Sequence, residues 1–219
     1  MVSSIYALTK PDVMVAANLS ISTQAEVQSV RLFSRVPFDE IRTIAWDSSS
    51  MTSNALSQIL LHERFGIKPD GVSLPPVQGR MLQECDACVM IGDAGMAGHS
   101  EQLYVMDLGA EWRALTGLPF VWALWVGRRG LSPSLVSRLQ WSHETALLTL
   151  DRVVEEAALE TGFSPSQCRF YFDHIMDYRL GPQHLAGLRA FGERLVGLGL
   201  VERLYKLRIV EAEEPALLR

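Results

Sequence analysis

The sequence predicts an α/β fold arranged as two lobes, and three observations lead to this prediction. Short apolar runs alternate with segments whose apolar residues recur every three or four positions, which favours a largely parallel sheet with helices between its strands. The C-terminal third has an almost wholly helical pattern. A chain of 219 residues that is 48% hydrophobic and 21% charged is also long and apolar enough to bury a sizeable core.

The strands are predicted from short apolar runs that end at turn-forming or polar residues. Such runs are too short for helices and lack the three- and four-residue spacing of an amphipathic helix. The six predicted strands cover residues 13–16, 29–34, 41–46, 87–91, 103–107 and 120–126.

The helices are predicted from apolar periodicity and from residues that start or end helices. An early helix runs from about Thr52 to Phe65, and Gly66 follows it as a C-cap. A long helix begins after Ser132-Pro133 and continues to about Glu160, because proline is favoured at the first helical position. Ser164-Pro165 starts a shorter segment, and a last strong helix follows Gly181-Pro182.

The order of these elements indicates that the chain crosses from one lobe to another and then returns. Strand–helix units come first, and the late helices then complete the first lobe. The crossings are predicted near Phe38 and near Pro119. Residues 39–119 would form the second lobe, and residues 1–38 with 120–219 the first.

Composition argues against several classes of function. The net charge of −5 disfavours a nucleic-acid partner or an anionic membrane surface, since both need a basic protein surface. The start of the chain lacks a signal-peptide pattern, and its most apolar stretch, 118–126, is too short to span a bilayer, so we expect a soluble, cytoplasmic protein. Cys85 and Cys88 have the spacing of a redox or zinc pair. Without a second such pair or nearby histidines we interpret them as core residues, and we predict no metal.

The segment 47–54, Asp-Ser-Ser-Ser-Met-Thr-Ser-Asn, is the most informative for function. It joins a predicted strand to a predicted helix. Free N–H groups at a helix start, the positive end of the helix dipole and adjacent hydroxyls together make a receptor for a carboxylate or phosphate. Thr52 and Ser53 are therefore candidate anion ligands. The alternative is that one hydroxyl merely caps the helix, but a cap needs only one residue.

Two other segments carry weaker signals. Ile91-Gly-Asp-Ala-Gly-Met-Ala-Gly98 directly follows a strand and places Asp93 where α/β folds hold ligands, although a simple turn explains its glycines equally well. Ser20-Ile-Ser-Thr-Gln24 is a hydroxyl-rich turn that is weak evidence by itself. The five histidines are scattered, and no serine lies in a GxSxG motif, so common hydrolase and metalloenzyme interpretations have no support.

Several of these segments together resemble the menaquinone-pathway family that acts on chorismate or on a dehypoxanthine-futalosine product. The resemblance covers nearly all of the chain, and it agrees in order and spacing. Its motifs are Ile21-Ser-x-x-x-x-Val-x-Ser-Val30, Asp47-Ser-x-Ser-x-Thr-Ser53, Ala55-Leu-x-x-Ile-Leu-Leu61, Ile91-Gly-Asp-Ala94, Asp107-Leu-Gly-x-x-Trp112, Thr116-Gly-Leu-Pro-Phe-Val-Trp-Ala123, Tyr178-Arg-Leu180 and Gly187-Leu-x-x-Phe191.

The resemblance implies a type II periplasmic-binding-protein-like fold with the substrate between its lobes. The Thr-Gly-Leu-Pro-Phe block and the C-terminal helices look closer to the chorismate dehydratase branch than to the 1,4-dihydroxy-6-naphthoate synthase branch. The implied reaction converts chorismate to 3-[(1-carboxyvinyl)oxy]benzoate in the futalosine route, without a cofactor. Thr52 and Ser53 would hold the ring carboxylate, Ser22 would add a polar contact, and Asp93 would shape the pocket floor. A homodimer is left open.

The chain departs from the family pattern in two places. Family members open with a strand and an Asn-bearing turn that reaches the substrate, and we expect this segment to precede the point matching Met1, which leaves the first lobe incomplete and the catalytic residue unknown. Ala25-Glu26 also replaces the family's Gly-Pro. A non-catalytic small-carboxylate-binding protein of the same fold therefore stays an alternative. The sister naphthoate synthase is another, but it would require a histidine in the cleft.

Overall fold

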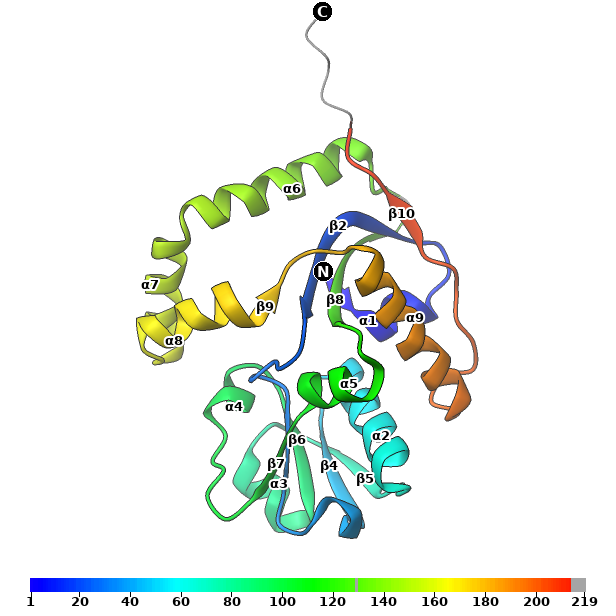
Figure 1. Ribbon diagram of the computed structural model, residues 1–219, viewed down its shortest axis with the longest axis vertical. Coiled ribbons are helices and arrows are strands. Elements are labelled where there is room, and N and C mark those ends of the chain that lie inside the picture. The colour runs from blue at the N-terminus through cyan, green and yellow to red at the C-terminus, as the bar shows by residue number, and fades with distance from the viewer. Residues whose placement is uncertain (129, 214–219) are drawn as a thin grey trace, which may run out of the picture.

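Two five-stranded sheets organise the computed structural model, which describes residues 1–128 and 130–213 (Figure 1). The first sheet has the order β1 (Val2–Ser3), β8 (Phe120–Arg128), β2 (Val13–Thr23) and β10 (Arg208–Val210), with β9 (Met176–Asp177) also pairing with β2. The second sheet has the order β5 (Asp70–Leu74), β4 (Thr43–Asp47), β6 (Ala87–Met90), β3 (Arg31–Ser34) and β7 (Tyr104–Asp107).

All six predicted strands are confirmed, each within a few residues except β2, which extends seven residues beyond its predicted end to Thr23. The strand β5 was not predicted, because its sequence Asp-Gly-Val-Ser-Leu is mostly exposed and lacks a buried apolar alternation. The strand lies at an edge of the second sheet, where only one side pairs. Its partner β4 supplies the main reason that this segment is extended.

The prediction of a largely parallel arrangement was wrong. The strands β2 and β8 are antiparallel, and β3 is antiparallel to both of its neighbours. Parallel pairs are confined to β4 with β5, β4 with β6 and β10 with β2. The reason is topological, because a strand that leaves a lobe and a neighbouring strand that returns to it run in opposite directions.

The pairing of β3 places the first crossing between the lobes earlier in the chain than predicted. The crossing was predicted near Phe38, but β3 already hydrogen-bonds to β6 and β7, so the chain reaches the second sheet before Arg31. The sequence pattern could not show this, since the partners of the 29–34 run lie more than fifty residues further along. The return follows β7 through α5 (Leu108–Thr116) to β8. We propose that the second lobe begins within residues 24–30, and not at 39.

The predicted early helix is α2 (Met51–Phe65), capped by the Ser50 side chain and ended by Gly66 at φ 69°. The predicted helix 133–160 is two helices, α6 (Pro133–Leu148) and α7 (Leu150–Thr161), broken at Thr149. The Thr149 hydroxyl donates back to the carbonyl of Thr145, at 3.2 Å, which satisfies a carbonyl group at the end of α6. Apolar spacing continues through this break and therefore did not reveal it.

The helices α6, α7 and α8 (Pro165–Phe170) form an arm that leaves the first sheet after β8 and returns to it at β9 (Figure 1). A π-helical turn, η2 (Tyr171–Ile175), joins the arm to β9. The last long helix is α9 (Pro182–Gly197), as predicted. Shorter helices complete the fold: α1 (Ser4–Thr9), η1 (Phe38–Glu40), α3 (Gln78–Glu84) and α4 (Gly92–Ala97).

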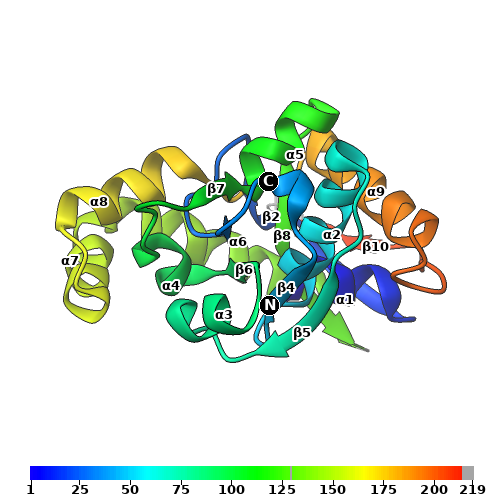
Figure 2. The same cartoon turned by 90° about the horizontal axis from the view of Figure 1, so that it is seen from below.

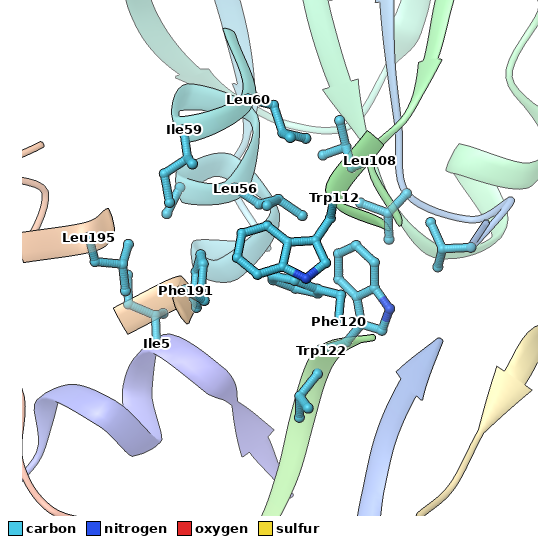
Figure 3. Close-up of a cluster of buried hydrophobic side chains, with 14 of the residues drawn as sticks. Ile5, Leu56, Ile59, Leu60, Leu108, Trp112, Phe120, Trp122, Phe191 and Leu195 are labelled. Carbon is cyan, nitrogen blue, oxygen red and sulfur yellow. The ribbon is translucent and has the colours of Figure 1, made fainter. Parts of the chain in front are cut away.

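One hydrophobic cluster joins the two lobes. Figure 3 shows Leu56, Ile59 and Leu60 of α2 and Trp112 of α5 converging on side chains of β8 and α9. The Trp112 ring centroid lies 5.3 Å from that of Phe120 and 6.3 Å from that of Phe191, in edge-to-face geometry. The lobes are therefore packed together on this side, and the space between them that can admit a ligand lies elsewhere.

Candidate binding site between the lobes

A cavity of about 400 Å³ lies where the N-terminus of α2 meets both sheets. Residues 49–53 form its helical wall. Val30, Ile91 and Gly92 line it from segments that adjoin strands of the second sheet, and four residues line it from the first sheet: Val2, Ser3, Trp122 and Ala123. Figure 2 shows α2 from below, beside α5 and α9. The cavity is thus an interlobe site built around a helix start.

The loop before α2 is fixed by its own hydrogen bonds. The buried carboxylate of Asp47 accepts from the backbone N–H of Ser49 at 2.8 Å and from its hydroxyl at 2.6 Å. The side-chain amide of Asn54 donates to the carbonyl of Asp47 at 2.8 Å. The Ser50 hydroxyl accepts from the N–H of Ser53 at 3.2 Å and so caps the helix. Ser49 therefore shapes the loop with both its N–H and its hydroxyl, whereas Ser50 caps the helix through its hydroxyl oxygen and keeps its proton to donate.

The remaining groups can receive an anion. Helix geometry leaves the first N–H groups of α2 without an intrahelical acceptor, and Ser50 satisfies only that of Ser53. Across residues 1–128 and 130–213, no acceptor is recorded for the N–H of Met51 or Thr52, and no bond for the Ser53 hydroxyl. The Thr52 hydroxyl accepts from the N–H of Ile5 at 3.2 Å, which leaves its proton to donate elsewhere. These groups and the helix dipole favour a bound carboxylate.

The structure brings three of the four predicted site residues to this region. Thr52 and Ser53 line the cavity. Asp93 lies next to the lining residue Gly92, at the start of α4, and is exposed. Gly92 has φ 58°, a left-handed conformation that glycine adopts readily, and it turns the chain from β6 into α4.

Ser22 lies apart from the cavity lining. It is fully buried in β2, and its hydroxyl donates to the carbonyl of Asp177 in β9 at 2.7 Å. The same hydroxyl accepts from that of Ser20 at 3.2 Å. These contacts give Ser22 a place in the pairing of β2 with β9. Its predicted contact with substrate has no support in this arrangement.

Asp93 also borders a smaller cavity, of about 90 Å³, beneath the arm. There the Tyr171 hydroxyl lies 2.8 Å from that of Ser29, which links the arm to the crossover segment. Burial raises the pKa of Tyr171, and the nearby charges of Asp93 and Asp107 raise it further, against the lowering effect of the Ser29 hydrogen bond. Tyr171 therefore stays protonated and acts as a neutral hydrogen-bonding group.

Trp122 is a site residue that sequence reasoning missed. Its indole N–H donates to the Thr23 hydroxyl at 3.2 Å, which ties β8 to the end of β2. The ring packs against Phe120 at a centroid distance of 4.4 Å with an interplanar angle of 58°, and Trp122 lines the cavity. The two-residue period of a strand places Phe120 and Trp122 on one face, so the pattern could have suggested an aromatic wall there.

Two carboxylates hold the segment where the chain crosses between the lobes. Asp107 caps α5 by accepting from the N–H of Gly109 and Ala110, and it also accepts from the N–H of Val27 and Gln28, at 2.7–3.1 Å in all. These hydrogen bonds fasten the crossover segment, residues 24–30, to the start of α5. A Cβ added at Gly109 would lie 2.4 Å from the carbonyl oxygen of Ala25, so the approach is too close for any side chain.

Asp177 fastens the other end of the segment. Its carboxylate accepts from the Gln24 side-chain amide and from the Arg179 guanidinium, and it lies 3.1 Å from His184 Nε2. Burial alone would raise the pKa of Asp177, but hydrogen bonds from Arg179 and Gln24, with the influence of His184, outweigh it and lower the pKa to about 2. Asp177 is therefore a buried, charged residue that fixes the crossover segment 24–30 through Gln24.

Neither metal-binding nor membrane-spanning elements are evident in the part of the chain that the structure describes. Within residues 1–128 and 130–213, no three His, Cys, Asp or Glu side chains come together as a metal site. No helix in these residues combines the length and apolar character that crossing a bilayer requires. Cys85 and Cys88 are both buried in the core of the second lobe, and burial raises the pKa of Cys88 to about 12.

Two sheets joined by two crossovers, with a cavity at a helix start between them, define a two-lobed α/β protein with a type II periplasmic-binding-protein-like fold. Solved structures of that fold are similar to this chain. Protein AF1704 from Archaeoglobus fulgidus matches with a TM-score of 0.68 at 19% identity, over 87% of this chain and 75% of that one. The periplasmic aliphatic sulphonate binding protein SsuA from Escherichia coli matches with a TM-score of 0.58 at 14% identity, over 94% and 73%.

The chain belongs to the menaquinone biosynthesis family, whose model matches residues 1–196. Among curated proteins, it is 28% identical over 230 aligned positions to the chorismate dehydratase of Thermus thermophilus, covering 94% of this chain and 82% of that protein. The family and the fold expected from the sequence motifs are thus confirmed.

Proposed function

We propose that this chain is a chorismate dehydratase, converting chorismate to 3-[(1-carboxyvinyl)oxy]benzoate and water in the futalosine route to menaquinone. The observation that supports this most directly is the start of α2, where free N–H groups and the Ser53 hydroxyl open into an interlobe cavity. Membership of the menaquinone biosynthesis family and the similarity to a chorismate dehydratase agree with it.

The cavity suits chorismate in size and polarity. Its volume of about 400 Å³ falls in the range of small-molecule sites. Chorismate carries a ring carboxylate and an enolpyruvyl carboxylate on a compact ring. The α2 terminus offers a receptor for one carboxylate, and Trp122 with Val30 offers an apolar wall for the ring.

The reaction can be derived from where charge develops. Loss of the proton at C3 leaves charge that spreads through the ring diene into the ring carboxylate, and departure of the C4 hydroxyl then makes the ring aromatic. The proton and the hydroxyl leave together as water, so no oxidant or reductant is needed. Donors placed at the carboxylate before reaction stabilise this charge without reorganising. Thr52 and Ser53 would supply those donors, and Asp93 would shape the nearby floor of the pocket.

The first test replaces single hydroxyls and follows aromatic product by ultraviolet absorbance. Ser53→Ala should lower kcat/KM for chorismate by roughly 10- to 100-fold, because a hydrogen bond to a charged group contributes about 1.5–3 kcal/mol. Ser48→Ala is the matched control, since this exposed hydroxyl lies in the same loop but does not line the cavity. Thr52→Val should lower activity too, but it also removes the acceptor for Ile5 and needs a parallel stability measurement. Equal activity of the Ser53 and Ser48 variants would contradict the assigned role.

A second candidate, a non-catalytic protein that binds a small carboxylate, is favoured by one observation. Among the described residues that line the cavity, no Asp, Glu or His supplies a side chain that could move a proton. Calorimetric titration with chorismate, run beside the absorbance assay, separates the two functions. Binding with turnover supports the dehydratase, and binding without turnover supports the binding protein. The absence of both binding and turnover would leave both proposals without support.

A further inference from the structure

The outer face of α6 carries two large apolar side chains that the fold leaves exposed. Trp141 is 66% exposed and Leu148 is 87% exposed. They are seven residues apart, so they lie on one stripe of the helix. The opposite face is used, because Val136 is buried, Gln140 donates to the carbonyl of Ala17 at 3.0 Å, and His143 packs on Tyr178. An exposed tryptophan and an exposed leucine on one stripe suggest a contact surface.

Two side chains of opposite charge flank this stripe at equal distances from Trp141 along the sequence. Arg138 lies three residues before Trp141 and Glu144 three residues after it, on either side of the stripe. Both side chains are exposed, and within the described residues neither takes part in an ion pair. The small residue Ser134 lies seven positions before Trp141, as far from it as Leu148 is on the other side.

We propose that α6 pairs antiparallel with α6 of a second copy of this chain, about a two-fold axis beside Trp141. Such an axis brings residues whose numbers are equally far from 141 to the same height along the paired helices. Arg138 then faces Glu144 of the partner subunit diagonally across the contact, and Glu144 faces Arg138 of the partner subunit. Leu148 packs over Ser134 of the partner subunit, and the two Trp141 rings meet at the centre.

The self-complementary pattern is the reason to choose a second copy over another partner. Opposite charges equally spaced about one aromatic residue satisfy each other under two-fold symmetry, whereas an unrelated protein would not require that spacing. Figure 1 shows α6 along the outer border of the molecule, so a second copy can approach it. One helix face is smaller than the roughly 800 Å² per partner of a standard interface, so we expect a micromolar dissociation constant.

Sedimentation velocity of the full chain, at roughly 1–200 μM to span that micromolar range, tests the proposal. We expect a reversible equilibrium between a 24.4 kDa monomer and its dimer. Trp141→Ala should abolish the dimer over this range. Leu159→Ala is the matched control, because this leucine is 88% exposed on α7 but lies off the stripe, and it should leave dimerisation unchanged. Circular dichroism checks that each variant is folded.

Charge reversal gives the sharper test. Arg138→Glu and Glu144→Arg should each weaken the dimer about tenfold or more, because each change creates two symmetric like-charge contacts. The double variant should restore wild-type affinity, since the pair is only exchanged. Arg113→Glu, on α5, controls for net charge. A monomer at all concentrations, a dimer insensitive to Trp141→Ala, or a double variant as weak as the single ones would overturn the proposal.

The competing occupant is the chain's own C-terminal segment, because the N–H of Glu213 donates at 2.9 Å to the hydroxyl of Ser137, which precedes Trp141 by four residues and lies on the same face of α6. A chain that ends at Glu213 distinguishes the two occupants. Equal dimerisation of the full and shortened chains supports a second copy. A dimer formed only by the shortened chain would show that residues 214–219 cover the face, and the proposal would fail.

Discussion

At the scale of single residues, the crossover segment 24–30 is held by two carboxylates that each make several hydrogen bonds, the partly buried Asp107 and the buried Asp177. Asp107 binds four backbone N–H groups on two segments, and Asp177 binds side chains from Gln24 and Arg179 next to His184. A buried carboxylate is tolerated only when such partners replace the water it loses. These residues therefore fix the position of the crossover, and through it the relative placement of the lobes.

Asp177→Asn should lower the free energy of unfolding by about 2 kcal/mol at pH 7, since the folded-state pKa lies near 2 and the ordinary value near 3.8. The sign follows from the lowered pKa. The carboxylate stabilises the fold fully above about pH 4, and this contribution is lost as the pH falls toward 2. Urea unfolding of both proteins at pH 7, 5 and 3 measures the difference.

Asp39→Asn is the control, because Asp39 is exposed on η1 and makes no recorded ion pair within the described residues. Its effect should stay within about 0.5 kcal/mol at each pH. A destabilisation by Asp177→Asn that is as large at pH 3 as at pH 7 would contradict the charged state assigned to this residue.

At the scale of elements, the start of α5 must approach the crossover segment very closely. Gly109 permits this approach, because a Cβ there would lie 2.4 Å from the backbone oxygen of Ala25 and 3.2 Å from the Thr23 hydroxyl. Asp107, two residues earlier, makes the hydrogen bonds that the approach allows. The start of α5 thus needs both residues: Asp107 to make the hydrogen bonds and Gly109 to let the crossover segment come close.

Gly109→Ala should destabilise the protein by about 1–3 kcal/mol, since the added methyl group meets backbone atoms that cannot rotate away. The midpoint of urea unfolding measures this effect. Gly79→Ala is a matched control within α3, where a Cβ meets nothing within 4 Å, and it should be neutral or stabilise by about 0.5–1 kcal/mol through helix propensity. Similar midpoints for the two variants would refute the close approach.

At the scale of the whole molecule, the lobes share a core. Trp112, on α5, is fully buried against β8 and α9, while α2 brings its apolar stripe into the same cluster (Figure 3). The candidate site at the start of α2 is therefore built on elements that both lobes hold in place. This arrangement keeps the helix start aimed at the interlobe cavity.

Trp112→Ala should cost about 3–5 kcal/mol, the range for removing a buried aromatic side chain. Because the cluster belongs to both lobes, the wild-type chain should unfold in one cooperative step. Far-ultraviolet circular dichroism and tryptophan fluorescence, followed together during urea unfolding, should then give the same midpoint. Two separate transitions in the wild-type protein would show that the lobes fold independently and that the shared core contributes little.

The sequence by itself determined six of the strands, the positions of the main long helices and the family. Those features depend on local patterns, such as the apolar run before Asp47 and the Ser132-Pro133 helix start, or on the order of short motifs. It also predicted Thr52 and Ser53 as candidate anion ligands, because a cluster of hydroxyls at a helix start has a local chemical reason, and both residues line the cavity. It could not determine that β3 belongs to the second sheet or that Thr149 breaks the long helix, since both depend on partners distant in sequence or on packing.

The tertiary structure alone decided how the site is composed. It placed Trp122 at the cavity, used the Ser22 hydroxyl in strand pairing, and divided the hydroxyls around α2 between loop, cap and free donors. The physical reason is that a hydrogen-bonding group serves a ligand only if the fold leaves it unpaired and open to a cavity. Residue type is local and can be read from the chain, whereas the partner of each group is set by contacts between segments far apart in sequence.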